Sequence, residues 1–259
     1  MSLTYSSYLR LDELLACQDP QSEGPEHDEM LFIVIHQVYE LWFKELLHEL
    51  DHLVARFDAD DLPAISSTLK RTLTILKVQV AQIDILETMS PVSFLSFRSR
   101  LEAASGFQSP QFRELEFLLG VRNRRLLVHH QGSPALPRLE RRLAEPSLWD
   151  AFVRFLGRRG HPIPAPLLAR DRSQSNPESP ELHPILIGIY REQPDLAQVC
   201  ERLVDLDEGI QEWRYRHVKM VERTIGSKQG TGGSAGAAYL RTTLFQPLFP
   251  DLWAIRAEL

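Results

Sequence analysis

Residues 27–50 read HDEMLFIVIHQVYELWFKELLHEL, and the apolar and aromatic side chains of this run return every three or four positions. That spacing is the period of an α-helix, and it places one set of side chains on a single stripe: Phe32, His36, Tyr39, Phe43, Leu46 and Leu50. We therefore predict one long helix from Pro25 to about Phe57 that buries this stripe. A histidine, His36, lies within it.

The same period predicts two further long helices. The first runs from about Pro63 to Met89, and its buried stripe consists of Leu69, Leu73, Leu76, Val80, Ile83 and Leu86. The second runs from Asp195 to about Thr224, is closed by Gly226, and has the stripe Leu196, Val199, Leu203, Leu206, Ile210, Trp213, His217 and Met220. The chain shows no internal repeat and no convincing run of alternating strand residues. The sequence thus predicts an all-α fold, a bundle of helices.

Shorter helices are predicted between the long ones. A serine N-cap followed by a proline is a strong start signal, and it occurs three times: Ser90-Pro91, Ser109-Pro110 and Ser133-Pro134. We expect Gly120 and Gly132 to end two of these helices. Residues 157–194 are rich in proline and serine, which predicts a long irregular segment that covers the core, with one short helix near residues 185–190. Neither side of that segment looks self-sufficient, so we expect a single domain over residues 1–259.

Composition excludes several classes of protein. The chain has 35 acidic and 29 basic residues, a net charge of −6 and no lysine-rich or arginine-rich run, which disfavours a nucleic-acid partner. Its longest nearly charge-free run, residues 30–39, is far shorter than the roughly 20 residues that a membrane-spanning helix needs. The start of the chain does not resemble a signal peptide. Cys17 and Cys200 are too few for a disulfide scaffold, so we expect free thiols and a cytoplasmic protein.

Two histidines on buried stripes are candidates for chemistry. A lone histidine in such a place is usually a core residue whose ring nitrogens are satisfied by neighbouring backbone or carboxylate groups. His36 and His217, however, lie on two different long helices, and helical bundles build cofactor sites from inward-facing histidines. Neutral imidazole is also a good axial ligand for heme iron. Residues alone leave both interpretations open.

The segment His48-Glu49-Leu50-Asp51-His52 matches the H-E-x-x-H pattern of zinc peptidases. Its place on the helix argues against a zinc site. Because Leu46 and Leu50 are on the buried stripe, His48 and His52 point away from the core. We expect a solvated face that also carries Glu49 and Asp51.

Two other features have open interpretations. Residues 230–236, GTGGSAG, follow a helix rather than a strand and lack the lysine of a phosphate-binding loop, so we expect either a mobile closure over a small ligand or a plain surface turn. Arg98 lies in the aromatic stretch SFLSFRSRLEAASGFQS, and an arginine amid buried aromatic residues usually pairs with a carboxylate. That carboxylate can belong to the protein or to a ligand.

Five ordered segments, which together span nearly the whole chain, resemble the tryptophan 2,3-dioxygenases, heme enzymes that open the indole ring of L-tryptophan. They are YSSYLRLDELL (5–15), HDEMLFIVIHQVYELWFKELLHEL (27–50), SFRSRLEAASGFQSPQFRELEFLLG (96–120), WRYRHVKMVERTIG (213–226) and GTGGSAGAAYLR (230–241). The resemblance implies heme b, as ferrous iron, held between long helices. It also implies cleavage of the indole C2–C3 bond by O2 to give N-formyl-L-kynurenine, the first step of tryptophan catabolism by the kynurenine pathway.

The resemblance also assigns roles to individual residues. His217 matches the proximal ligand of the heme iron, and His36 matches the histidine that accepts a hydrogen bond from the indole N–H. Phe32 would pack on the indole ring, Arg98 would bind the substrate carboxylate, and Thr231 would contact the amino-acid ammonium or carboxylate. Ser105 would lie near the heme and O2. Phe94 stands near the carboxylate position, where some family members have a tyrosine.

In the family, Tyr5 and Tyr8 reach into the pocket of a neighbouring subunit, which implies that residues 1–24 form an N-terminal arm exchanged within a homotetramer built as a dimer of dimers. Two alternatives remain beside the dioxygenase. One is a heme oxygenase of the same fold that inserts a single oxygen atom into a substituted tryptophan or indole in specialised metabolism. The other is a heme sensor without turnover.

Overall fold

The computed structural model describes residues 2–24, 26–231 and 236–259, and within these ranges the regular structure is helical with no strand. The α-helices are α1 (Tyr5–Leu9), α2 (Leu11–Leu14), α3 (His27–Asp58), α4 (Leu62–Leu86), α5 (Pro91–Phe97), α6 (Pro110–Leu118), α7 (Leu136–Ala144), α8 (Leu148–Arg158), α9 (Ala165–Leu168), α10 (His183–Glu192), α11 (Pro194–Ile225), α12 (Ala237–Arg241) and α13 (Pro250–Ala254). Short 3-10 helices cover Arg98–Leu101 (η1), Gly106–Gln108 (η2), Arg124–His130 (η3) and Ile255–Ala257 (η4). The prediction of an all-α fold is confirmed.

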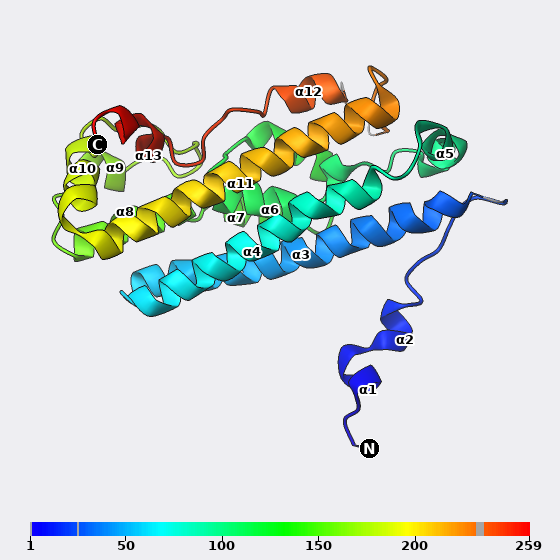
Figure 1. Cartoon of the computed structure of the whole chain (residues 1–259), viewed down its shortest axis with the longest axis horizontal. Helices are drawn as coiled ribbons and strands as arrows, with labels where there is room; N and C mark the ends of the chain where they lie inside the picture. The colour runs from blue at the N-terminus through cyan, green and yellow to red at the C-terminus, as the bar shows by residue number, and fades with distance from the viewer. Residues whose placement is uncertain (1, 25, 232–235) are drawn as a thin grey trace.

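Three long helices, α3, α4 and α11, form the body of the molecule (Figure 1). Helix α4 packs along both α3 and α11. The leucine and isoleucine residues predicted for the stripe of α4 are buried, as are most stripe residues of α3 and α11. Phe32, Trp213 and the two stripe histidines are only partly covered, and these four lie towards one end of the bundle.

Helix α8 completes the core but was not predicted. Ser147 caps it, with its hydroxyl accepting from the Asp150 amide at 3.2 Å. Trp149, Phe152 and Phe155 are all fully buried. Its apolar residues lie on one side and its charged residues on the other, so the sequence carried both an amphipathic pattern and the Ser147–Asp150 capping pair, and these signals were overlooked in a short segment.

Two of the three predicted serine caps are confirmed. The Ser90 hydroxyl accepts from the Ser93 amide at 3.0 Å, and the Ser109 hydroxyl accepts from the Phe112 amide at 3.1 Å. The third prediction is wrong, because the Ser133 hydroxyl accepts from the Ala135 amide at 3.2 Å and so closes a turn. Helix α7 begins only after that turn.

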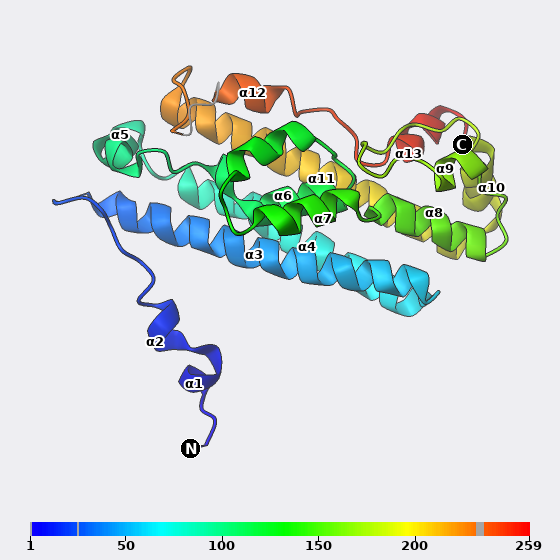
Figure 2. The same ribbon diagram turned by 180° about the vertical axis from the view of Figure 1, so that it is seen from behind.

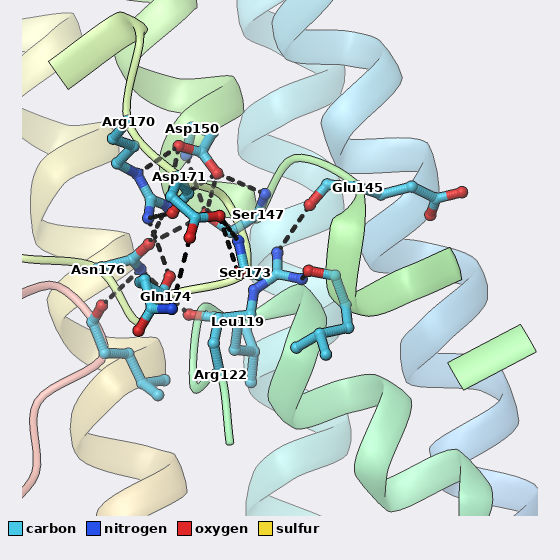
Figure 3. Close-up of polar contacts among 12 residues, drawn as sticks. Leu119, Arg122, Glu145, Ser147, Asp150, Arg170, Asp171, Ser173, Gln174 and Asn176 are labelled. Carbon is cyan, nitrogen blue, oxygen red and sulfur yellow. Dashed lines mark hydrogen bonds and ion pairs between the residues drawn. The ribbon is translucent and has the colours of Figure 1, made fainter. Parts of the chain in front are cut away.

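The proline-rich segment is held on the body by a polar cluster (Figure 3). Arg170 binds both carboxylate oxygens of Asp150 at 2.9 Å and donates to the Asn176 side-chain oxygen at 2.8 Å. The Asn176 amide nitrogen donates to the Leu248 carbonyl at 2.9 Å. The segment contains α9 and α10, of which only a helix near residues 185–190 was predicted. It is therefore largely irregular in secondary structure but fixed in position.

The N-terminal arm has no core of its own. Helices α1 and α2 bury no residue, and both project away from the bundle (Figures 1 and 2). Its end is tied to α3, where the Gln21 amide donates to Glu29 at 2.8 Å and the Gln18 side chain donates to Gln37 at 2.6 Å. Among all described helices, none has the length and apolarity needed to cross a membrane.

Candidate active site

A large cavity opens between α3, α4, α6 and α11, with α5, α12 and the loops beside them around its mouth. The space amounts to about 1500 Å³, open mouth included. The volume within it that water-sized molecules can occupy is about 290 Å³, near the lower end of the about 300–1,000 Å³ that is usual for ligand pockets. Its walls are mainly aromatic and aliphatic side chains.

His36 faces this cavity from α3. Its Nδ1 lies 2.7 Å from the carbonyl oxygen of Phe32, one turn earlier. A carbonyl only accepts, so Nδ1 carries the proton and Nε2 presents a lone pair. The exposed surface of His36 faces the cavity. Burial by the surrounding protein lowers the pKa of His36, although the Phe32 carbonyl and the charge of Glu40 oppose this effect. His36 is therefore a neutral hydrogen-bond acceptor at neutral pH.

His217 faces the same cavity from α11. Its ring lies parallel to the Trp213 indole, at 3° and 5.2 Å between centroids. Burial lowers the pKa of His217 to about 4, with the nearby His36 adding to the effect. Within the described part of the chain, the imidazole forms no hydrogen bond. A neutral imidazole with an unengaged lone pair at an apolar cavity is the donor that heme iron takes as an axial ligand, so these residues fit a heme group.

A buried charge cluster, which the sequence analysis missed, lies on the cavity wall between α6 and α11. Glu116 forms ion pairs with Arg113 and, at 3.0 Å, with Arg214. The three residues are between 4% and 8% exposed. Two guanidinium groups against one carboxylate leave a net positive charge, and the buried Nε of Arg113 has no partner among the described residues. The wall therefore favours an anionic group, such as a carboxylate of a bound cofactor.

Arg98 extends the site at the start of η1, beside an aromatic wall. Phe32, Phe94 and Phe97 form that wall, with ring centroids 5.5–5.7 Å apart. One terminal nitrogen of Arg98 donates to the Gln229 carbonyl, while its Nε is buried without a partner. The partner found in this chain is thus a neutral carbonyl rather than a carboxylate, which leaves the guanidinium charge available to a ligand.

Ser105 and Thr231 line the mouth of the same cavity. The Ser105 hydroxyl accepts from the Phe107 amide at 3.4 Å and caps η2. The Thr231 hydroxyl donates to the carbonyl of Ala104 and so joins the glycine-rich segment to this turn. Residues 232–235 of the predicted closing loop lie outside the described residues.

Tyr5 and Tyr8 are not brought to the cavity. They are 76% and 71% exposed on the arm, and neither lines the site. All other residues predicted for the site line the cavity, except Phe32, which packs behind His36 at 4.1 Å between ring centroids.

The H-E-x-x-H pair forms no metal site in the described structure. His48 and His52 are exposed, as predicted. The prediction that Glu49 faces solvent is wrong. Its side chain is 5% exposed and accepts a hydrogen bond from Arg71 of α4 at 2.7 Å. No group of three or more histidine, cysteine, aspartate or glutamate side chains placed to hold a metal occurs among the described residues.

Comparison with known proteins places the chain in one family. The sequence model of tryptophan 2,3-dioxygenase matches residues 1–134 and 181–259. A tryptophan 2,3-dioxygenase of Herpetosiphon aurantiacus is 59% identical over 258 residues, which cover 100% of this chain and 99% of the relative. Those of Anaeromyxobacter sp. (strain K) and Caulobacter vibrioides are 57% and 44% identical, covering 100% and 99% of this chain and 97% and 98% of the relatives. With a helical bundle, two cavity histidines and full-length similarity of this degree, the chain belongs to the tryptophan 2,3-dioxygenase family.

Proposed function

We propose that this chain is a heme b-dependent dioxygenase that cleaves the indole C2–C3 bond of L-tryptophan with O2 and gives N-formyl-L-kynurenine. One observation carries the proposal beyond family membership. Two neutral imidazoles, His36 and His217, face one cavity from different helices, and Arg98 stands at its mouth with an unpartnered buried Nε. This arrangement offers a metal-ligating nitrogen, a hydrogen-bond acceptor and an anion-binding group to the same space.

His217 would ligate the heme iron, and Trp213, stacked on its ring, would fix the orientation of the imidazole. Arg113 and Arg214 would bind the carboxylates at the edge of the macrocycle. When bound, ferrous heme would supply the activation of O2, for which protein side chains have no equivalent. The contribution of the chain is ligation, orientation and a cavity lined by apolar side chains.

The substrate would occupy the space between His36 and Arg98. The Nε2 lone pair of His36 would accept the indole N–H, and Phe94 would border the ring, while Phe32 would support His36 from behind. Arg98 and Thr231 would bind the amino-acid end, and Ser105 would lie near the reacting atoms. Because a buried guanidinium left without its partner is costly, this arrangement selects an amino acid over free indole.

The proposed enzyme is a homotetramer, a dimer of dimers, in the cytoplasm. The arm supports exchange between subunits, since it exposes Tyr5 and Tyr8 and its helices α1 and α2 bury no residue. These tyrosines would complete a neighbouring site. Two unpaired cysteines fit a reducing compartment.

Reconstitution with hemin tests the proposal. The wild-type protein should develop a Soret band that His217→Ala shifts or abolishes, whereas the exposed His52→Ala should leave it unchanged. The reduced protein should then convert L-tryptophan to N-formyl-L-kynurenine under O2, with both atoms labelled from ¹⁸O₂. A Soret band insensitive to His217→Ala would refute the ligand assignment. A product with one labelled oxygen would point to the single-oxygen alternative, and heme binding without any turnover of indoles would point to a sensor.

A further inference from the structure

The C-terminal tail, residues 237–259, forms part of the cavity wall. After α12, it runs back along α11 towards α13 and α10 (Figure 1). Tyr239, Leu240 and Thr243, near its beginning, line the cavity. The wall that they form depends on how the tail is attached to α11.

Side chains of α11 hold the tail at successive points. Glu222 pairs with Arg241 at 2.7 Å, and Glu201 pairs with Arg256 at 2.8 Å near the other end. Both pairs are substantially solvent-exposed, and exposed ion pairs contribute little to stability. Arg214 donates to the Thr243 carbonyl only at a long 3.4 Å. Between these points the tail buries Leu248, Phe249, Leu252 and Ile255 in the core, and a polar attachment to α11 lies there as well.

Asp207 provides that attachment. Its side chain is completely buried. One carboxylate oxygen accepts from the Leu248 amide at 2.8 Å, the Phe249 amide at 3.1 Å and the Trp253 indole at 2.9 Å. The other oxygen accepts from Gln211 at 2.8 Å. Charge-assisted bonds are about twice as strong as neutral ones, and without them two backbone amides of the tail would be left unpaired in the interior.

A second contact limits how the tail can move at this point. The Asn176 amide nitrogen donates to the Leu248 carbonyl at 2.9 Å, so both backbone groups of Leu248 are engaged, one by α11 and one by the polar cluster of Figure 3. The tail is thereby fixed a few residues beyond the point where it leaves the cavity.

We propose that Asp207 is a positioning residue of the active site, which acts through the tail by holding residues 239–243 closed over the bound cofactor. Asp207 lies ten residues before His217 on α11, about 15 Å along the helix axis, so it does not contact the site itself. The inference rests on the proposed heme site. It predicts that cofactor retention depends on a carboxylate remote from the cofactor.

Three substitutions test this with graded strength. Asp207→Ala removes both acceptor oxygens, so the three N–H groups of the tail and the Gln211 side chain lose their partner. Asp207→Asn keeps an oxygen for those three donors, and its amide can donate to Gln211 after that side chain flips, so only the charge is lost. Trp253→Phe removes a single donor from a side chain that is 37% exposed, and it should fold normally.

Two measurements report on these variants. Hydrogen exchange of the cofactor-free protein, followed by mass spectrometry, reports on attachment of residues 239–253. Transfer of hemin from the loaded protein to excess apomyoglobin reports on retention. Asp207→Ala should accelerate both amide exchange and hemin transfer by about tenfold or more, a change that corresponds to about 1.4 kcal/mol. Asp207→Asn and Trp253→Phe should show smaller increases, and they carry the test if Asp207→Ala does not fold.

Two controls separate positioning from general stability. Glu201→Gln weakens the exposed pair at the far end of the tail, and it should leave hemin release unchanged. Leu69→Ala removes a fully buried side chain of α4, and it should lower the melting temperature without faster hemin release. Unchanged exchange in residues 239–249 of the Asp207 variants would overturn the inference, as would faster exchange with normal hemin release. Failure of the wild type to take up hemin would instead refute the proposed cofactor. The exchange measurement would still report on the tail, because it uses the cofactor-free protein.

Discussion

Replacing Arg98 by lysine should weaken binding of L-tryptophan while leaving binding of ligands without a carboxylate nearly unchanged. In the structure, Arg98 uses one terminal nitrogen on the Gln229 carbonyl and keeps its buried Nε without a partner, so its fork can offer at least two donors to a substrate carboxylate. Lysine keeps the charge but cannot form the paired, planar contact. Loss of one charge-assisted hydrogen bond costs about 1.5–3 kcal/mol, which is about 10- to 150-fold in affinity.

Affinity is best measured on the heme-loaded protein without oxygen, by the change that each ligand causes in the Soret band. L-tryptophan and tryptamine, which lacks the carboxylate, form the informative pair. Arg98→Lys should raise the dissociation constant for L-tryptophan alone, and in turnover KM should rise with little change in kcat, because binding is lost equally from ground state and transition state. Arg100→Lys, an exposed arginine of the same 3-10 helix, is the matched control. An equal loss for tryptamine, or no loss for L-tryptophan, would show that Arg98 does not bind the carboxylate.

Three further predictions concern stability and reactivity. Burial raises the pKa of Cys200 to about 12, so a disulfide reagent should modify only exposed Cys17 in the native protein and both thiols after unfolding; rapid modification of two native thiols would contradict this. Burial alone would raise the pKa of Asp150, but hydrogen bonds from Ser147 and the charge of Arg170 outweigh it and hold the pKa below its usual value. The stability that Asp150 contributes is therefore present above its unfolded-state pKa and is lost as the pH falls through its folded-state pKa. On acidification below pH 5, the free energy of unfolding from urea denaturation should therefore fall less in Asp150→Asn than in the wild type. An equal fall in both proteins would refute this. Gly120 has φ = +97°, and a Cβ there would lie 2.0 Å from the side-chain nitrogen of Asn176. Gly120→Ala should therefore lower the free energy of unfolding in urea by about 2–4 kcal/mol. A loss below about 1 kcal/mol would show that Asn176 moves freely.

The long helices were predictable because each presents one buried stripe over many turns. The boundaries predicted for the first and last of them lie within about two residues of α3 and α11. The caps at Ser90 and Ser109 were equally local, since a serine and the proline after it are enough to start a helix. Helix α8 carries the same kinds of signal, an apolar side and a serine cap at Ser147, but over only three turns, and the prediction missed it.

The same distinction holds for the candidate site. His36 and His217 stood out because a histidine interrupts an otherwise apolar stripe. The cluster of Arg113, Glu116 and Arg214 gave no such signal, since charged residues on a helix usually face solvent and only the approach of α6 to α11 buries these three. Glu49 was misjudged for the same reason, as its partner Arg71 comes from the next helix.

The cavity between α3 and α11 has a consequence for the lifetime of the protein. Side chains that border a space of this size lack neighbours on one side, so they forgo the dispersion contacts that a filled interior supplies. Any molecule that fills the space binds only the folded chain, and it stabilises that chain in proportion to the logarithm of its free concentration. Scarcity of the occupant therefore raises the fraction of unfolded chains that proteases can degrade. With heme as the proposed occupant, the amount of intact protein should follow the supply of heme.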